Sequence, residues 1–185
     1  MTEAPWKPTK LQLQEAVDKT VPDLVAPNLK VLFVGINPGL YTAAIGHHFG
    51  RPGNRFWKVL HLSGFTPRQL SPFEEHELLT YGVGVTNMVP RTTATAAELA
   101  HDEIVEGGKR LVKLVKKYTP STVAVLGVQA YRQAFEHRRA QVGRREETLA
   151  EVPVWVLPNP SGLQAHYQLQ DMVALFEELR RSTLE

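Results

Sequence analysis

The 185-residue chain contains no cysteine. This absence excludes disulfide bonds, zinc sites with thiolate ligands and iron–sulfur clusters held by cysteine. The chain also lacks any apolar run close to the roughly 20 residues that span a bilayer. Its first residues, MTEAPWKPTK, are too polar for a signal peptide. We therefore expect a soluble protein of the cytoplasm with no membrane partner.

Motifs that bind phosphate or metal are missing as well. Neither the dinucleotide-binding pattern GxGxxG nor the P-loop pattern GxxxxGK[ST] occurs in the sequence. Most histidines are scattered without the spacing of metal ligands: His61, His76, His101, His137 and His166. We expect neither a metal ion nor a cofactor.

Charge of one sign is in little excess, because the formal net charge is only +2. The basic residues are nevertheless unevenly spread, and they crowd into Arg51–Arg55, Lys109–Lys117 and Arg138–Arg145. Such runs could form a basic face for nucleic acid, although charge runs are usually the solvated faces of helices and loops. Charge alone therefore does not decide the function.

The hydrophobic pattern predicts an α/β fold in one domain over residues 1–185, with residues 1–10 loosely ordered. Four short apolar segments rich in β-branched residues read as buried strands: Lys30–Ile36, Gly82–Met88, Thr122–Val128 and Val152–Leu157. Helical patterns separate them. This alternation predicts a three-layer α-β-α sandwich around a short, mostly parallel central sheet.

The expected helices follow from apolar spacing and capping residues. A short helix is expected at Leu11–Val17, and Asn54 can cap a second over Arg55–Leu62. Ser71 or Pro72 can open a third over Phe73–Leu79. Two longer helices are expected, one through Ile104–Val115 to an end near Tyr118 and one over Leu169–Arg180.

Ligands of open α/β sheets bind beyond the carboxyl ends of the strands, and two loops there are unusual. Gly35-Ile36-Asn37-Pro38-Gly39 follows the first strand, and its glycines and proline hold Asn37 at the mouth of a tight turn. An ordinary Gly-Pro turn is the alternative.

The loop after the fourth strand is Leu157-Pro158-Asn159-Pro160-Ser161-Gly162-Leu163-Gln164. It presents the single apolar side chain of Leu163 on a stiff tip. Leu163 either folds back onto the core or acts as a wedge that enters DNA where a base has been flipped out.

Taken together, these loops resemble the mismatch-specific uracil-DNA and thymine-DNA glycosylases of the uracil-DNA glycosylase superfamily. The linking segments GHHFGRPGNRFWKVL and GVTNMVPRTT carry the same resemblance, which runs from about Leu29 to Phe176. It implies a monomeric enzyme, nucleoid-associated if bacterial, that acts on double-stranded DNA. The enzyme would flip uracil, with thymine and ethenocytosine as further candidate bases, from G·U- or G·T-type mismatches and hydrolyse the N-glycosidic bond without a cofactor.

The resemblance also implies roles for individual residues. Asn37 would position the hydrolytic water. The base pocket would be formed by Gly35, Ile36, Thr42, His48, Phe49, Asn87 and Asn159. The wedge and the phosphate contacts would come from Ser161, Gly162, Leu163, Gln164 and Arg91. Loop capping is an alternative role for Asn87 and Arg91.

Four positions depart from the family's pattern. Asn159 stands where the more uracil-selective branches have a histidine, so strict selectivity for uracil is not expected. Pro90 replaces an acidic residue found in several relatives, and Leu163 and Ala165 lie where others place an arginine. A carboxylate from the loop around Pro90 is therefore not expected to assist the reaction, and the wedge is apolar.

The chemistry of Asn37 agrees with this assignment. An amide is no general base, but it can position a water, and an oxocarbenium-like transition state needs little nucleophilic push. Two rival functions share the scaffold: a noncatalytic binder of DNA lesions and a hydrolase of free nucleosides.

Overall fold

The computed structural model describes residues 3–162 and 166–184, which form an α/β fold around one five-stranded sheet. The strands are β1 (Val31–Gly35), β2 (Val83–Asn87), β3 (Thr122–Leu126), β4 (Gly143–Leu149) and β5 (Val152–Leu157). Their order is β2-β1-β3-β5-β4, and every neighbouring pair is parallel except β4 with β5. The four predicted strands and the predicted fold class are confirmed.

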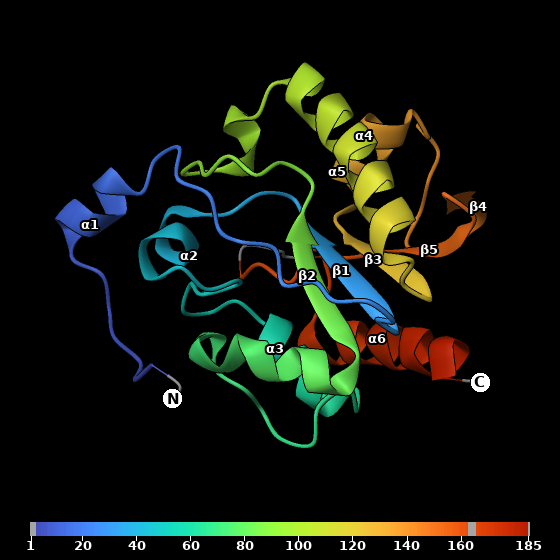
Figure 1. Cartoon of the computed structure of the whole chain (residues 1–185), viewed down its shortest axis with the longest axis horizontal. Coiled ribbons are helices and arrows are strands. Elements are labelled where there is room, and N and C mark those ends of the chain that lie inside the picture. The colour runs from blue at the N-terminus through green and yellow to red at the C-terminus, as the bar shows by residue number, and fades with distance from the viewer. Residues whose placement is uncertain (1–2, 163–165, 185) are drawn as a thin grey trace.

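Helices cover both faces of the sheet (Figure 1). The helices α4 (His101–Tyr118) and α5 (Val128–Phe135) pack on one face. The other face is covered by α3 (Phe56–Leu62), the 3₁₀ helix η1 (Pro72–Tyr81) and α6 (Leu169–Leu184). The α-β-α sandwich therefore has the layers that the sequence pattern predicts.

Alternation along the strands explains why both faces are apolar. Successive side chains of a strand point to opposite faces, and β1 shows this directly. Phe33 belongs to the core under α3 and α6, and its ring lies 5.5 Å from that of Phe56. Leu32 and Val34 belong to the core under α4 and α5. A strand buried on both sides must be apolar at every position, which is the pattern used to find it.

One strand was not predicted. β4, with the sequence GRREETL, is an edge strand whose side chains alternate between more and less exposed positions. Its polar residues hid it within the basic run Arg138–Arg145. An antiparallel edge strand needs only one buried face, so its sequence gives a weaker signal.

The helices differ from the prediction in their bounds and in three additions. The short helix α1 (Lys10–Glu15) packs against α2 (Leu40–Ile45). The helices α2 and α5 and the 3₁₀ helix η2 (Ala96–Glu98) were not predicted. The segment expected as a helix over Phe73–Leu79 is the 3₁₀ helix η1. Asn54 still accepts a hydrogen bond from the Phe56 amide at 3.0 Å, although α3 itself begins at Phe56.

The segment before β1 lies along the edge of the sheet at β2. Leu24 and Val85 exchange backbone hydrogen bonds of 2.8 and 2.9 Å, which adds an isolated antiparallel bridge to β2. Residues 3–9 have no regular structure, and the ring of Trp6 lies 6.4 Å from that of Phe73. Among the helices of the described residues, none is both long and apolar enough to cross a membrane.

Candidate active site

A pocket of roughly 430 Å³ opens at the carboxyl ends of the strands, where the loops after β1, β2 and β5 meet. Its volume lies in the range typical of small-ligand sites. Asn37 and Ser161 line it, and so do all the residues predicted for the base pocket: Gly35, Ile36, Thr42, His48, Phe49, Asn87 and Asn159. The structure therefore brings together segments that are more than 100 residues apart.

Asn37 is fixed by both of its N–H groups. Its Nδ2 donates to the backbone oxygen of Arg91 at 2.9 Å and to Oγ1 of Thr93 at 2.8 Å. The loop backbone is tied to the same segment, because the amide of Thr93 donates to the oxygen of Pro38 at 3.2 Å. Among the residues that the structure describes, none donates a hydrogen bond to Oδ1 of Asn37. This oxygen is a pre-oriented acceptor at the pocket wall.

Asn87 ends β2 and lies beside Gly35. Its residue is only 6% exposed, yet its side-chain amide has no hydrogen-bond partner within the described part of the chain. Its amide atoms face the pocket and are not sealed in the core, so a ligand or water in the pocket can satisfy them. A Cβ on Gly35 would lie 2.7 Å from Asn87 Oδ1, so only glycine leaves this amide room. Asn87 thus presents a donor and an acceptor to whatever enters the pocket.

Phe49 supplies a flat apolar wall. Its ring stacks on that of Phe56, with centroids 4.0 Å apart and planes at 29°. Its backbone is in the left-handed region, with φ of 50°, and its carbonyl accepts from Trp57 Nε1 at 3.3 Å. Phe49 is therefore held in a strained backbone conformation by its contacts with Phe56 and Trp57, and such strain is typical of functional sites.

The two adjacent histidines differ in their surroundings: His48 lines the pocket and His47 does not. His48 is buried, and its Nε2 lies 2.8 Å from the oxygen of Pro22, so this nitrogen carries the donated proton. His47 turns away, and its Nδ1 lies 2.9 Å from Glu75 Oε1. The buried Glu75 also accepts from the amide of His48 at 2.8 Å. Sequence reasoning missed Glu75, because nothing in the run SPFEEHE marks one glutamate as buried.

No carboxylate is among the described residues that line the pocket. Its polar groups are amides, hydroxyls, an imidazole and the guanidinium of Arg51. The site can therefore position a water and hydrogen-bond a flat heterocycle, but it offers no carboxylate base.

A family model of the uracil DNA glycosylase superfamily matches residues 22–180. The chain belongs to this superfamily. A solution NMR structure from Methanosarcina acetivorans, provisionally named a uracil DNA glycosylase, has a TM-score of 0.59 and 18% sequence identity. The match covers 89% of this chain and 99% of that one, and at this identity it shows the fold alone. Membership in the superfamily makes the chain a DNA glycosylase by family, an enzyme type that hydrolyses N-glycosidic bonds in DNA.

The loop after β5 also lines the glycosylase pocket, and hydrogen bonds from Arg55 hold this loop in place. Arg55 donates from Nη2 to the oxygen of Ser161 at 3.1 Å and from Nη1 to that of Tyr167 at 2.7 Å. Asn159 Oδ1 accepts from the amide of Ser161 at 3.0 Å. A Cβ on Gly162 would lie 2.9 Å from the oxygen of Gly53, so this position also excludes a side chain. Sequence analysis placed Arg55 in a basic run and at the start of an expected helix, but it did not link Arg55 to the loop after β5.

The predicted wedge residues Leu163 and Gln164, with the neighbouring Ala165, lie outside the described residues. Arg91 is described, and the structure does not bring its side chain to the glycosylase pocket. Its Nε lies 2.7 Å from Glu103 Oε1 and its Nη1 lies 3.4 Å from Asp18 Oδ1. The hydrogen bonds of Arg91 lower the pKa of Glu103 to about 2. Only the backbone of Arg91 contacts Asn37.

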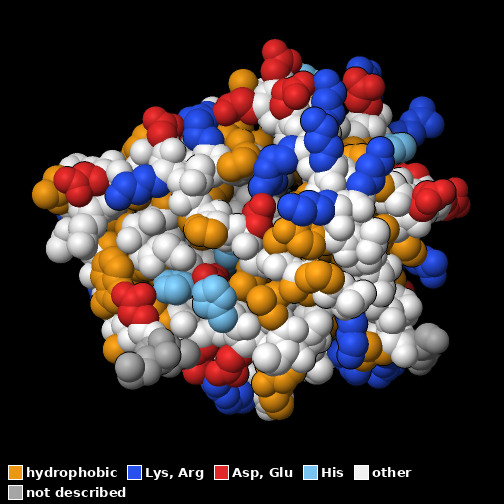
Figure 2. Space-filling model, viewed as in Figure 1, with side chains coloured by type: hydrophobic (Ala, Val, Ile, Leu, Met, Phe, Trp, Pro, Cys, Tyr) orange, Lys and Arg blue, Asp and Glu red, His pale blue; other side chains and the backbone are white. Residues whose placement is uncertain are grey.

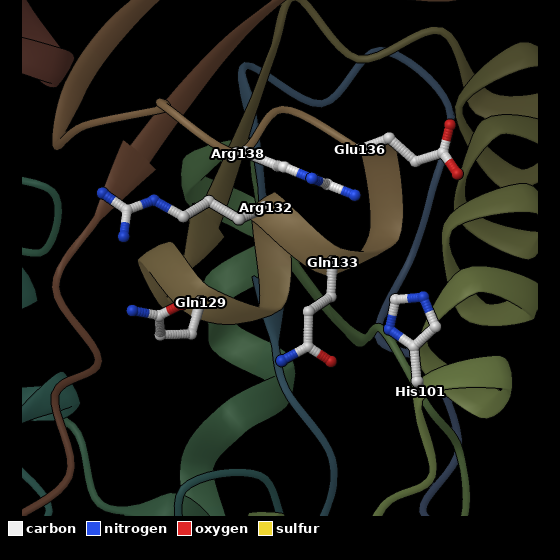
Figure 3. Close-up of a pocket in the computed structure, with 6 residues that line it drawn as sticks. All are labelled: His101, Gln129, Arg132, Gln133, Glu136 and Arg138. Atoms are coloured by element: carbon white, nitrogen blue, oxygen red, sulfur yellow. The ribbon is translucent and has the colours of Figure 1, made fainter.

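A second hollow, of roughly 500 Å³, lies between the start of α4 and α5 (Figure 3). Its lining residues are His101, Gln129, Arg132, Gln133, Glu136 and Arg138. Arg132 donates from Nε to the oxygen of Ala140 at 2.8 Å. None of the predicted site residues lines this hollow. Within the described ranges, 3–162 and 166–184, no group of three or more His, Asp or Glu side chains is placed to hold a metal ion.

Proposed function

We propose that this glycosylase removes uracil from mismatched duplex DNA by a hydrolysis in which Asn37 positions the water. The observation that carries the proposal is the convergence of three features on one pocket. These are the free Oδ1 of Asn37, the unpartnered amide of Asn87 and the stacked ring of Phe49. A flat heterocycle with both donors and acceptors on its edge complements all three.

Base recognition is proposed to use stacking and the edge of the ring. A flipped pyrimidine would lie against Phe49, and its N3–H and O4 would match the acceptor and donor of the Asn87 amide. The close approach of Gly35 to Asn87 keeps this end of the pocket narrow. His48 and Thr42 line the same pocket, where they would meet the 5-position and limit the size of a substituent there.

The proposed chemistry is dominated by positioning. Asn37 Oδ1 would accept a hydrogen bond from a water and hold it against the anomeric carbon, while the C–N bond breaks toward an oxocarbenium-like sugar. The electron pair of that bond leaves with the base, and hydrogen-bond donors around its carbonyl oxygens stabilise the anion. The water then forms the new C–O bond and loses a proton to solvent. Because no carboxylate lines the described pocket, we expect a slow enzyme.

The duplex side of the proposal rests on the loop after β5. Asn159 and Ser161 border the pocket. Leu163, which follows in the sequence, would act as the wedge and fill the space that the flipped base leaves in the duplex. The phosphate contacts proposed for this loop would make binding weaken as salt rises.

The test is single-turnover excision from otherwise identical duplexes carrying U·G, U·A, T·G or ethenocytosine·G, and from single-stranded uracil DNA. We expect release of free base that is fastest from U·G, unaffected by EDTA and suppressed by Asn37→Ala. Tight binding to U·G without base release would show a lesion binder. Release from free deoxyuridine but not from DNA would show a nucleoside hydrolase.

A further inference from the structure

The unpartnered amide of Asn87 is held in place from outside the pocket. Arg110 of α4 donates from Nη1 to the backbone oxygen of Asn87 at 2.9 Å. The same guanidinium donates from Nη2 to Asp23 Oδ2 at 2.8 Å. The side chain of Asn87 has no partner of its own among the described residues, so its position depends on how its main chain is fixed.

The approach of α4 to this point requires a glycine. Gly107 lies one turn before Arg110, and a Cβ there would lie 2.4 Å from the backbone oxygen of Met88. Residues three apart share a helix face. Because Gly107 has no side chain, α4 comes close enough for Arg110 to reach Asn87. Gly107 thus lies against Met88 and Arg110 binds Asn87, two successive residues at the end of β2.

Asp23 connects the same arginine to the segment before β1. Its Oδ1 accepts from Oγ1 of the fully buried Thr86 at 2.6 Å, one residue before Asn87. The side chains of Arg110 and Asp23 are 33% and 24% exposed. One hydrogen bond joins the two side chains, and each makes a further hydrogen bond to the end of β2. A partly desolvated ion pair of this kind fixes geometry more than it adds stability.

Pro22, the residue before Asp23, contacts His48, which also lines the pocket. The oxygen of Pro22 lies 2.8 Å from His48 Nε2. The bridge of Leu24 with Val85 pins the same short segment to β2. Residues 22–24, which we call the strap, therefore touch His48 on one side and the end of β2 on the other.

We propose that Arg110 and Asp23 are positioning residues for base excision: they set the place of Asn87, and through the strap its spacing from His48. The proposal rests on the proposed function. An error of about 1 Å in a group that meets the substrate can cost on the order of 100-fold in rate. Neither residue lines the pocket, so neither touches the base.

Arg110 also lies in a basic neighbourhood, which gives a rival role. Lys and Arg side chains gather over α4 in Figure 2, and Lys109, Lys113 and Lys116 border a shallow hollow with Arg110. If Arg110 instead bound phosphate, its loss would weaken duplex binding and lower the salt dependence. A positioning role would slow excision at saturating enzyme with little effect on binding.

The experiment is a double-mutant cycle on the single-turnover excision rate from a U·G duplex, with Arg110→Met, Asn87→Ala and the double variant. We expect Arg110→Met to slow excision about 10-fold or more. In the double variant we expect no further loss beyond Asn87→Ala, because Arg110 acts through Asn87. Duplex affinity should change less than about threefold.

Two matched controls accompany the cycle. Arg145→Met removes an arginine–carboxylate pair of similar burial, 3.0 Å from Glu147, on the distant strand β4. Lys113→Met removes a charge from the same helix. Both should excise at the wild-type rate. If Arg110→Met does not fold, Asp23→Asn replaces it in the cycle with the same expectations.

The outcomes separate the two proposals. A wild-type protein that releases no base contradicts the proposed function, and the positioning role falls with it. An active wild type with a normal rate for Arg110→Met contradicts the positioning role alone. Additive losses in the double variant, or a loss confined to duplex affinity, also overturn it.

Discussion

At the scale of single residues, what matters in the pocket is which atoms of each amide are already in use. Asn37 uses both N–H groups within the protein, whereas Asn87 uses neither end of its amide among the described residues. The first therefore presents one fixed acceptor, and the second presents a donor and an acceptor that are free to bind what enters the pocket. Two chemically identical side chains are thereby suited to different tasks.

Asn37→Ala tests the first of these tasks. Excision from a U·G duplex should fall about 10²–10³-fold, the scale of losing one positioned polar catalytic group. Binding of the duplex should remain, since Asn37 acts on the water. Rates at saturating enzyme, duplex affinity and melting temperature should be measured together. Near-normal excision would remove Asn37 from the mechanism.

Gly35→Ala tests the space that Asn87 needs. The new methyl group would lie 2.7 Å from Asn87 Oδ1, so the amide must move and excision should fall on the order of 10-fold or more. Gly39→Ala on the same loop is the comparison, because a Cβ there meets nothing within 4 Å. It should lose less activity. Equal losses in the two variants would show that the loop, and not the contact with Asn87, is responsible.

At the scale of elements, the loops of the site are braced by residues that lie outside them. Arg55 at the start of α3 grips the loop after β5, Glu75 of η1 supports the histidine pair, and Arg110 of α4 holds the end of β2. Each of these helices therefore fixes one segment that lines the pocket. Rigid elements hold catalytic groups more accurately than loops do by themselves.

Sequence reasoning located the loops but not their braces. GINPG and NPSGL are recognisable because glycine and proline restrict the backbone locally. Arg55 and Glu75 act across 106 and 27 residues of sequence, and such long-range contacts leave no local pattern. The apolar strands were found for the same reason that β4 was missed: local pattern reveals a fully buried strand and hides a polar edge strand.

Arg55→Met tests the brace of the loop after β5. It removes the hydrogen bonds to the oxygens of Ser161 and Tyr167, which flank the predicted wedge. Excision from duplex should fall about 10-fold, and excision from single-stranded DNA should fall less, because no stacked partner strand has to be opened there. Arg68→Met, at an exposed ion pair with Glu74 and Glu77, is the control and should match the wild type. Equal losses on both substrates, in proportion to unfolded protein, would show a purely structural role.

At the scale of the whole molecule, the site occupies one end of the sheet, and the polar edge strand β4 borders β5 on the side away from β1. On β4, Glu147 accepts hydrogen bonds from the Tyr131 hydroxyl at 2.6 Å and from Arg145 Nε at 3.0 Å. Burial raises the pKa of Glu147, but hydrogen bonds that include these two outweigh burial and lower it to about 2. Glu147 does not line the glycosylase pocket, so its titration is expected to act on the stability of the fold.

This pKa predicts a particular loss of stability in acid. Glu147 is depressed in the folded protein, so it binds protons more weakly there than in the unfolded chain. Its contribution is present in full above the unfolded value of 4.5 and is lost as the pH falls from there toward about 2. Urea unfolding at about pH 7, 5 and 3 should therefore show a steeper acid loss for the wild type than for Glu147→Gln. Arg145→Met removes one of the hydrogen bonds that hold the pKa down, so its acid loss should lie between the two. Parallel pH curves for all three proteins would show that Glu147 titrates alike in the folded and unfolded states.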